Sequence, residues 1–403
     1  MSVIFNKAIT LIFFLLFAYQ GFYILVSLFG KEKKEEKENV LHRFAILICA
    51  RNEERVIGEL LDSIERQTYP KECVQVYVMA DNCDDDTAAI AKDHGAVVYE
   101  RKDTVRKGKG YALQELLKEV SDEYDACIVF DADNVLDPHY LEAMNHSFSQ
   151  GHEIITGYRN SKNYDSNWIS AGYSLWFLRE NRFLNKARYL LGVSCAVSGT
   201  GFLFSREVLR NWDYHTLTED LEFTADQVCR GRKIAFCEDA VLYDEQPVLF
   251  MQSFHQRMRW AKGFLQVFLK DGGRLLKGVG RGNFSCFDML NTLTSAYGLS
   301  VLTLIVNVLT LLGMILAEEP LVPFLMSLRK GLMRAYIGMY LIGLLTTLTE
   351  WKKIRTSSIY KILYTFTFPL FMATYLPIAV CALFTEVQWT PIEHSISMRH
   401  ENV

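Results

Sequence analysis

Residues 125–133 read Asp-Ala-Cys-Ile-Val-Phe-Asp-Ala-Asp, a short apolar run that ends in two carboxylates. The run has no helical period, so it predicts a strand that is buried on both faces of a parallel sheet. Similar runs lie earlier in the chain, with helical segments between them. Together they predict an α/β fold with a mostly parallel sheet covered by helices on both faces. The expected strands are residues 44–50, 74–80, 96–100 and 125–130, and the expected helices are residues 56–66 and 88–94.

Polar side chains directly follow three of these strands. Ligands of open α/β sheets bind at the carboxyl ends of the strands, so these side chains are candidates for one ligand site. Hard divalent cations such as Mg²⁺ or Mn²⁺ prefer oxygen ligands and often keep one or two carboxylates together with substrate phosphates. We therefore expect Asp131 and Asp133 to hold a metal and a diphosphate; an acidic turn without a ligand is the competing interpretation. The strand-end residues are Arg51, Glu53, Asp81, Asp131 and Asp133.

A basic, glycine-bearing segment lies between the third and fourth strands. Residues 105–113 read Val-Arg-Lys-Gly-Lys-Gly-Tyr-Ala-Leu. Glycine lets a backbone approach a ligand closely, and the first turn of a helix offers free N–H groups to a phosphate. The charge of Lys109 adds to this effect. The segment therefore predicts a phosphate contact, and a solvated basic loop is the alternative.

Two segments further along the chain supply more candidates. Residues 197–204 predict a turn at Gly199 that leads into a strand, where an extended ligand could meet the backbone. Leu217-Thr218-Glu219-Asp220 predicts a helix start with Thr218 at the N-cap. Carboxylates are stable in a first helical turn, which would be a structural role; alternatively, Asp220 is a general base. A last strand is expected at residues 241–245.

The segment Gln256-Arg257-Met258-Arg259-Trp260 falls within a predicted helix over residues 250–269. At about 3.6 residues per turn, Gln256, Arg259 and Trp260 share one face of that helix. An indole stacks on a sugar ring, an amide contacts hydroxyls, and a guanidinium binds a diphosphate with two parallel bonds. The trio favours a sugar bound beside a phosphate, whereas an amphipathic helix at a lipid surface is the alternative.

Long apolar segments flank this charged central part. Residues 8–29 can cross a hydrocarbon core of about 30 Å as a retained anchor. Lysines cluster at 31–37, after the anchor, which places the following residues in the cytosol. Residues 290–316 and 332–349 are also long enough to span. Pro369 and Pro377 interrupt residues 359–384, which predicts either a broken span or a helix in the interface; we expect the interfacial arrangement, with the tail on the cytosolic side.

The composition limits the class of partner and the compartment. A net charge of −4 argues against a nucleic-acid partner. The nine cysteines include no Cys-x-x-Cys pair, which indicates a reduced, cytosolic domain. The sequence does not indicate an oligomeric state. The expected regions are an anchor (1–30), a cytosolic domain (31–249), an amphipathic helix (250–285), membrane helices (286–384) and a tail (385–403).

The ordered motifs resemble those of the membrane-integrated family 2 glycosyltransferases, which include cellulose, mixed-linkage glucan, hyaluronan, chitin and poly-N-acetylglucosamine synthases. The resemblance covers nearly the whole chain and implies a GT-A-like domain between an N-terminal transmembrane helix and C-terminal membrane helices. The motifs that carry it are Asp81, Asp131-Ala132-Asp133, Thr218-Glu219-Asp220 and Gln256-x-x-Arg259-Trp260.

The resemblance also implies roles for individual residues. Asp81 would contact the nucleotide base, Lys109 the phosphates, and Asp131 and Asp133 the uridine diphosphate with its Mg²⁺ or Mn²⁺. Asp220, beside Glu219, would be the catalytic base. The donor-binding residues would be Arg51, Glu53, Asp81, Lys109, Asp131 and Asp133, and the acceptor-binding residues Gly199, Gln256, Arg259, Trp260 and Trp389.

The tail differs from the hyaluronan synthase pattern. Trp389 is followed by Thr-Pro-Ile-Glu-His, where those enzymes carry Gly, Thr and Arg, so the resemblance favours glucan or poly-N-acetylglucosamine synthases. An interfacial anchor is the alternative role for Trp389.

These observations predict a processive, inverting glycosyltransferase of the plasma membrane. We expect UDP-glucose as donor and a growing β-glucan as acceptor, which the enzyme passes across the lipid bilayer. The alternatives are a UDP-N-acetylglucosamine-using poly-N-acetylglucosamine or hyaluronan-like synthase, a non-processive transferase to a lipid acceptor, and a transporter or scaffold with an inactive nucleotide domain.

Overall fold

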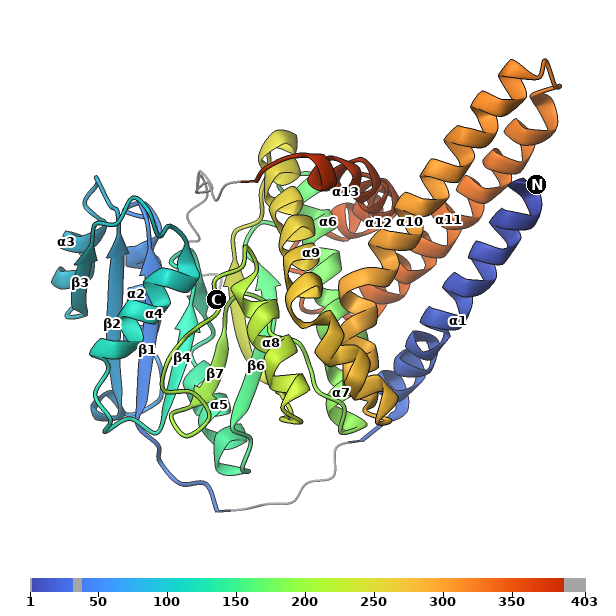
Figure 1. Ribbon diagram of the computed structural model, residues 1–403. Helices are drawn as coiled ribbons and strands as arrows, with labels where there is room; N and C mark the ends of the chain where they lie inside the picture. The colour runs from blue at the N-terminus through green and yellow to red at the C-terminus, as the bar shows by residue number, and fades with distance from the viewer. Residues whose placement is uncertain (1, 32–37, 388–403) are drawn as a thin grey trace.

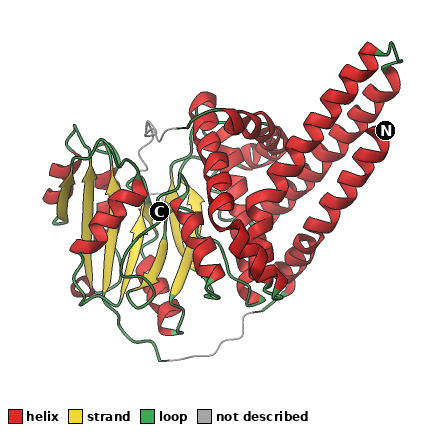
Figure 2. Cartoon of the chain, viewed as in Figure 1, coloured by secondary structure: helices red, strands yellow, loops and turns green. Residues whose placement is uncertain are grey.

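The computed structural model describes residues 2–31 and 38–387. Its centre is an eight-stranded sheet with the order β3-β2-β1-β4-β7-β6-β8-β5 (Figures 1 and 2). The strands are β1 (Phe44–Ala50), β2 (Val74–Asp81), β3 (Val97–Arg101), β4 (Ala126–Phe130), β5 (Val135–Leu136), β6 (Ile154–Ser161), β7 (Phe202–Ser205) and β8 (Ala235–Asp244).

The sheet combines a parallel half with a mixed half. Strands β1 to β4 are all parallel, as the sequence predicts. Strand β7 runs antiparallel to both β4 and β6, and β5 runs antiparallel to β8, whereas β6 and β8 are parallel to each other. The expected α/β fold with a mostly parallel sheet is confirmed, and β5 and β7 are its antiparallel strands.

Helices cover both faces of the sheet. In β1, Ala45 and Leu47 pack with residues of α4, α6 and α8 on one face, whereas Phe44, Ile46 and Ile48 pack with residues of α2, α3 and α5 on the other. This alternation within an almost wholly apolar strand is what a strand buried on both faces requires. The helices of this domain are α2 (Ile57–Glu65), α3 (Thr87–Asp93), α4 (Lys109–Glu119), α5 (Tyr140–Ser149), α6 (Trp168–Arg179), α7 (Lys186–Leu190) and α8 (Glu219–Cys229), with a 3₁₀ turn at Lys71–Cys73.

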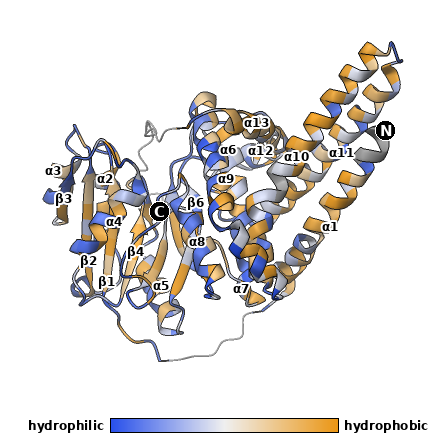
Figure 3. Ribbon diagram, in the orientation of Figure 1, coloured by the Kyte–Doolittle hydropathy of each residue, from blue (hydrophilic) through white to orange (hydrophobic). Residues whose placement is uncertain are grey.

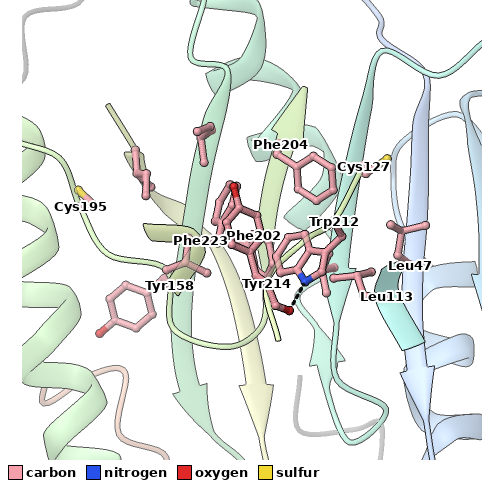
Figure 4. Close-up of a cluster of buried hydrophobic side chains, with 14 of the residues drawn as sticks. Leu47, Leu113, Cys127, Tyr158, Cys195, Phe202, Phe204, Trp212, Tyr214 and Phe223 are labelled. Carbon is pink, nitrogen blue, oxygen red and sulfur yellow. Dashed lines mark hydrogen bonds between the residues drawn. The ribbon is translucent and has the colours of Figure 1, made fainter. Parts of the chain in front are cut away.

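An aromatic cluster fastens the loop that leads into α8. Phe202 and Phe204 of β7 face Trp212, whose ring stacks on Phe223 of α8 at 5.3 Å between centroids (Figure 4). Trp212 is fully buried, and its indole Nε1 donates a hydrogen bond of 3.1 Å to the Tyr214 carbonyl. The cluster therefore fixes α8 against the sheet, together with the first turn of that helix.

The second half of the domain contains elements that the sequence analysis does not predict. Strand β6 lies next to β7 and β8, and β8 begins at Ala235 rather than at the expected residue 241. A π-helical segment, η2 (Glu180–Asn185), joins α6 to α7. Helix α9 (Phe250–Gly280) begins where the sequence predicts and ends eleven residues after the expected end at residue 269.

Long helices project from the domain in a separate layer (Figure 1). These are α1 (Ser2–Phe29), α10 (Phe284–Leu316) and α11 (Val322–Thr349), and they are largely apolar along the projecting part (Figure 3). Within the described residues, four helical segments are long and apolar enough to cross a membrane. They are residues 7–29, 298–316, 322–349 and 358–384.

A buried ion pair ties the first of these helices to the domain. Arg188 of α7 donates to Asp288 of α10 through Nε at 2.7 Å and Nη2 at 3.1 Å. The hydroxyls of Tyr19 and Tyr23 in α1 donate to the same carboxylate at 2.7 Å and 3.1 Å. One carboxylate thus joins α1, α7 and α10.

The last apolar segment is divided at Thr374 into α12 (Ser358–Ala373) and α13 (Tyr375–Phe384). A proline ring clashes with the carbonyl four residues before it, so Pro377 accounts for the break. The buried Arg257 of α9 donates to the Phe371 carbonyl at 3.3 Å and to the Thr374 hydroxyl at 2.7 Å. Helix α12 packs on α6 and α11, and α13 packs on α9. Trp389 and the tail after residue 387 lie outside the described residues.

Candidate active site

The carboxyl edge of the parallel strands carries the predicted metal ligands and a lysine. Asp131 and Asp133 follow β4, and Lys109 begins α4. The Lys109 ammonium donates to Asp131 Oδ1 at 2.5 Å and to the Gly199 carbonyl at 2.7 Å. The Asp131 backbone N–H donates to the Thr200 hydroxyl at 2.9 Å. Lysine, carboxylate and glycine turn therefore form one connected unit, although they are far apart in sequence.

The two glycines beside Lys109 have different roles. Gly108 has a φ of +115° and open space around its Cα, so it gives the backbone a conformation that other residues rarely adopt. A Cβ at Gly110 would lie 2.2 Å from the Tyr214 carbonyl oxygen. Gly110 therefore serves close packing of α4 against the loop before α8, whereas the sequence analysis assigns both glycines to a ligand approach.

Asp81 lies at the end of β2 in an ion pair with Arg101 of β3. Arg101 Nη1 donates to Asp81 Oδ1 at 2.6 Å, and both side chains are 7% exposed. Burial raises the pKa of Asp81, and Arg101 counteracts that shift. Arg101 also donates to the Arg106 carbonyl at 2.5 Å, which orders the loop before Lys109.

A second arginine connects the strand ends near Asp133. Arg159 of β6 donates from Nε to Asp244 Oδ2 at 2.6 Å and from Nη1 to the Ser198 carbonyl at 3.0 Å. Its guanidinium stacks over the Phe177 ring at 3.8 Å. Burial raises the pKa of Asp244 to about 6; Arg159 lowers it and Asp133 raises it. The carboxylates of Asp131, Asp133 and Asp244 thus surround the Arg159 guanidinium with negative charge.

The donor set at this edge fits a hard divalent cation. No group of three or more His, Cys, Asp or Glu residues suited to a metal occurs in the part of the chain that the structure describes. Asp131 and Asp133 are two adjacent carboxylates, and a cation held by them would have its remaining positions left to phosphate oxygens and water, as is usual for Mg²⁺. The oxygen donors of this predicted pair are of the type that Mg²⁺ and Mn²⁺ prefer.

The first turn of α8 places Glu219 and Asp220 across from this edge. Thr218 occupies the N-cap position as predicted, but its side chain makes no capping hydrogen bond. Glu222 instead accepts hydrogen bonds from the backbone N–H groups of His215 at 3.0 Å and Thr216 at 2.8 Å. The Thr218 side chain contacts Gly263 of α9, where a Cβ would lie 2.5 Å from it.

The two adjacent carboxyls of α8 share an environment that favours protonation. Burial, followed by the charge of Asp220, raises the pKa of Glu219 to about 7. Burial also raises the pKa of Asp220, while the backbone N–H of Leu221 and the charges of Lys109 and Arg259 lower it. Gly199, with a φ of +75°, lies directly opposite, since a Cβ there would be 3.8 Å from Asp220 Oδ2. The pair therefore retains a proton at a higher pH than two solvated carboxyls would.

Helix α9 presents the three residues that the sequence analysis groups on one face. Arg259 Nη1 donates to the Leu217 carbonyl at 2.8 Å, so this guanidinium also anchors the loop before α8. The Trp260 ring meets Tyr173 edge to face at 5.7 Å and Phe177 at 6.2 Å between centroids. The buried Oε1 of Gln256 accepts no hydrogen bond from any described residue.

Every predicted site residue that the structure describes lines a single cavity of about 3090 Å³. We use two names for its sides. The strand edge comprises Arg51, Glu53, Asp81, Lys109, Asp131 and Asp133, and the helix wall comprises Phe177, Glu180, Glu219, Asp220, Gln256, Arg259 and Trp260. Gly199 lies between them. The structure brings these residues together, and their chemical roles stay predictions.

The same cavity continues between the projecting helices. One face of α1 contributes to it, with Thr10, Phe17 and Gln20, and one face of α10 contributes Ser300 and Thr303. Helix α1 packs on α10, and α11 packs on α12. The helices therefore form two pairs with the cavity between them.

Four cavity or strand-end residues are not among the predicted site residues: Arg101, Arg159, Glu180 and Asp244. Asp244 could have been found, because it lies within the expected strand at residues 241–245, close to where its carboxyl end would lie. Arg159 and Glu180 belong to β6 and to the π-helical segment, which have no local signal in the sequence. Arg101 is the last residue of β3, one residue after the expected end of that strand.

A family model described as "Glycosyltransferase like family 2" matches residues 42–263. That range is more than half of the 403 residues. It includes both the strand edge and the helix wall.

Two curated proteins show the similarity in sequence. The chain is 25% identical over 254 residues to the poly-beta-1,6-N-acetyl-D-glucosamine synthase of Staphylococcus epidermidis, covering 61% of this chain and 59% of that protein. It is 27% identical over 294 residues to the beta-monoglucosyldiacylglycerol synthase of Trichormus variabilis, covering 69% and 61%. The chain thus spans about three-fifths of the length of the curated relatives it matches.

One solved structure shows the similarity in fold. The mannosyltransferase PcManGT from Pyrobaculum calidifontis, in complex with GDP-Man and Mn²⁺, superposes with a TM-score of 0.61 at 16% sequence identity. The superposition covers 95% of this chain and 99% of that protein. The shared fold therefore extends from the central sheet into the projecting helices.

Proposed function

The chain belongs to the glycosyltransferase like family 2, and on that premise we propose that it elongates a glycan at a membrane from a UDP-activated sugar, with inversion at the anomeric carbon. The single observation that carries this proposal is the continuous cavity. It joins the acidic strand edge to the helix wall and continues between the projecting helices.

The strand edge is the proposed donor site. Asp81 would meet the nucleotide base, and Lys109 would lie against the diphosphate. Asp131 and Asp133 would hold Mg²⁺ or Mn²⁺, which supplies positive charge to the departing diphosphate. The structural relative in complex with GDP-Man and Mn²⁺ supports a nucleotide sugar and a divalent cation for this fold.

The helix wall is the proposed site of proton transfer. Asp220 accepts the proton of the attacking acceptor hydroxyl as its oxygen forms a bond to the anomeric carbon. The bond from that carbon to the diphosphate breaks, and the electron pair leaves with the diphosphate beside Lys109. Burial and the charge of Asp220 raise the pKa of Glu219, which favours a proton on Glu219 and leaves Asp220 as the proposed base.

The acceptor would lie between Trp260 and the projecting helices. Trp260 offers an aromatic surface for a terminal sugar, and Gln256 offers an amide to its hydroxyls. Beyond them, Gln20, Ser300 and Thr303 give the cavity polar groups. Polar side chains that face a cavity at membrane depth mark a path for a polar substrate. This favours a growing glycan that moves along the cavity.

N-acetylglucosamine is the sugar that we propose. The similarity to a poly-beta-1,6-N-acetyl-D-glucosamine synthase supports it over the glucose and β-glucan expected from the sequence.

A lipid acceptor with single transfers is the second candidate. Phe13, Phe14 and Phe17 of α1 form an apolar part of the cavity that suits an acyl or prenyl chain. The similarity to a beta-monoglucosyldiacylglycerol synthase supports the same reading.

The proposed topology places the central domain and the tail in the cytosol. Helices α1, α10 and α11 would cross the membrane, and α12 with α13 would lie at its surface. The break at Thr374 and the packing of the two short helices on α6 and α9 support this arrangement.

Product analysis tests the proposal. The purified full-length chain, supplied with Mn²⁺ and labelled UDP-N-acetylglucosamine or UDP-glucose, should release UDP and form a long polymer from the former. A labelled product of one sugar on diacylglycerol would establish the second candidate instead. Activity only with UDP-glucose would contradict the proposed donor.

A further inference from the structure

The π-helical segment η2 (Glu180–Asn185) lies in the middle of a continuous helix over residues 168–190. A π turn contains an extra residue, and such turns are rare and frequent at functional sites. Here the turn exposes Glu180 to the cavity. The next residue, Asn181, is buried and donates to the Arg159 carbonyl at 2.8 Å. The π turn thus directs Asn181 toward strand β6 and the adjacent Glu180 toward the cavity.

The neighbouring cations of Glu180 have other partners. Arg159 is bound to Asp244, Arg188 to Asp288, and Arg179 donates to Gln20 at 2.9 Å. Within the part of the chain that the structure describes, the Glu180 carboxylate has no hydrogen bond or ion pair of its own. It contributes charge to this arginine-rich surrounding without direct contact.

A half-buried carboxylate is stable only when hydrogen-bond donors reach it. The hydroxyls of a sugar are such donors, and the cavity beside Glu180 is where the proposed acceptor would lie. Asp220 of α8 and Trp260 of α9 line the same cavity from two other helices. Three contacts from three helical segments suffice to fix both the plane and the rotation of a sugar ring.

We propose that Glu180 binds a second hydroxyl of the acceptor's terminal sugar and thereby selects which hydroxyl reaches Asp220. This inference rests on the proposed function, and it makes Glu180 a determinant of linkage. A carboxylate that balances nearby arginines without touching substrate is the alternative.

The test compares four full-length proteins: wild type, Glu180→Ala, Glu180→Gln and Glu238→Gln. Glu238 is a matched control, because it is a partly buried carboxylate that contacts the same helix through Lys186 at 2.5 Å and does not line the cavity. The acceptor is a short β-linked N-acetylglucosamine oligosaccharide, with UDP-N-acetylglucosamine and Mn²⁺. The readouts are the KM for each substrate, UDP release without acceptor, and the linkage of the product.

Glu180→Ala should raise the acceptor KM roughly ten- to hundredfold, as expected for the loss of a hydrogen bond to a charged group. The donor KM and UDP release without acceptor should stay near wild type, and the product should contain mixed linkages. Glu180→Gln keeps one acceptor oxygen and should show a smaller rise in KM. Glu238→Gln should leave the acceptor KM and the linkage unchanged.

An unchanged acceptor KM and a single linkage in Glu180→Ala, with normal elongation by wild type, would overturn this inference alone. Failure of wild type to extend the oligosaccharide would reject the proposed function. If Glu180→Ala loses UDP release as well, the Glu180→Gln protein decides by the same KM comparison.

Discussion

The strand edge and the helix wall face one cavity but are built differently. The strand edge takes most of its side chains from residues at or just after the ends of parallel strands, and Lys109 from the start of α4, so most of its positions are set by the sheet. The helix wall takes its side chains from α6, the π-helical segment, α8 and α9, whose mutual placement depends on tertiary contacts. The strand edge can therefore be predicted from local sequence, whereas the helix wall depends on which helices pack together.

Loss of the proposed base at the helix wall should affect sugar transfer most strongly while leaving nucleotide binding nearly unchanged. Asp220→Asn removes the proposed base and should lower the rate of sugar transfer by roughly 10²- to 10⁴-fold. UDP affinity should change little, because the strand edge is intact. Rates come from UDP release and affinity from calorimetric titration with UDP and Mn²⁺.

Asp213→Asn provides the control for this change. Asp213 lies in the loop before α8 with its side chain 81% exposed, so activity should stay at the wild-type level. Near-normal turnover in Asp220→Asn would refute the assignment of Asp220 as the catalytic base.

The next effect tests the strand edge by itself. Asp133→Asn removes a proposed metal ligand and should lower activity roughly a hundredfold at limiting Mn²⁺, since a bound cation contributes several kcal/mol to charge stabilisation. A Mn²⁺ titration of UDP release measures this. Asp125→Asn, at the opposite end of β4, should titrate as wild type; equal Mn²⁺ dependence in both variants would refute the assignment.

The contact between α8 and α9 tests how far the helix wall depends on packing. A Cβ at Gly263 would lie 2.5 Å from the Thr218 side chain, so Gly263→Ala should destabilise the fold by about 1–3 kcal/mol. Thermal unfolding in detergent measures this. Gly273→Ala lies on the same helix with open space around it and should be neutral or stabilising, by up to about 1 kcal/mol.

Thr218→Gly combined with Gly263→Ala should restore much of the lost stability, because it removes the side chain that the new methyl group meets. A Gly263→Ala protein as stable as Gly273→Ala would show that the close contact does not constrain α9.

The smallest effect is a shift in pH dependence. Arg259 lowers the pKa of Asp220, and Asp220 must be ionised to act as a base. Arg259→Gln should therefore raise that pKa and move the acid limb of kcat/KM to higher pH, while Arg259→Lys should move it less. A pH profile of UDP release measures both, and an acid limb that moves down or stays fixed contradicts the electrostatic coupling.

The predictability of the fold follows the same division. Strand β1 was expected at residues 44–50, where the structure has it, because a strand buried on both faces leaves a strong apolar signal. Strand β6 continues through Gly157 into Tyr-Arg-Asn-Ser, which resembles a loop in sequence, although neighbouring strands bury it. The start of α8 is recognisable from its first turn of carboxylates, but Thr218 makes no side-chain cap there, and Glu222 binds the loop before the helix instead.

The cavity residues divide in the same way. Asp131 could be expected at this edge because it follows a parallel strand, and Lys109 because it begins the helix after the neighbouring strand pair. Glu180 could not, since its direction depends on a π turn that no local pattern announces. Trp389 lies outside the described residues, so its proposed role stays a prediction.

The carboxylate of Asp288 has a consequence for how the chain is made. Its hydrogen-bond partner Tyr19 is synthesised 269 residues earlier, and at roughly 5–20 residues per second the ribosome needs on the order of tens of seconds to supply Asp288. During that interval the first helix emerges without the group that holds its two tyrosine hydroxyls. Docking of the N-terminal helix is therefore a late step of biogenesis, completed only after the catalytic domain has left the ribosome.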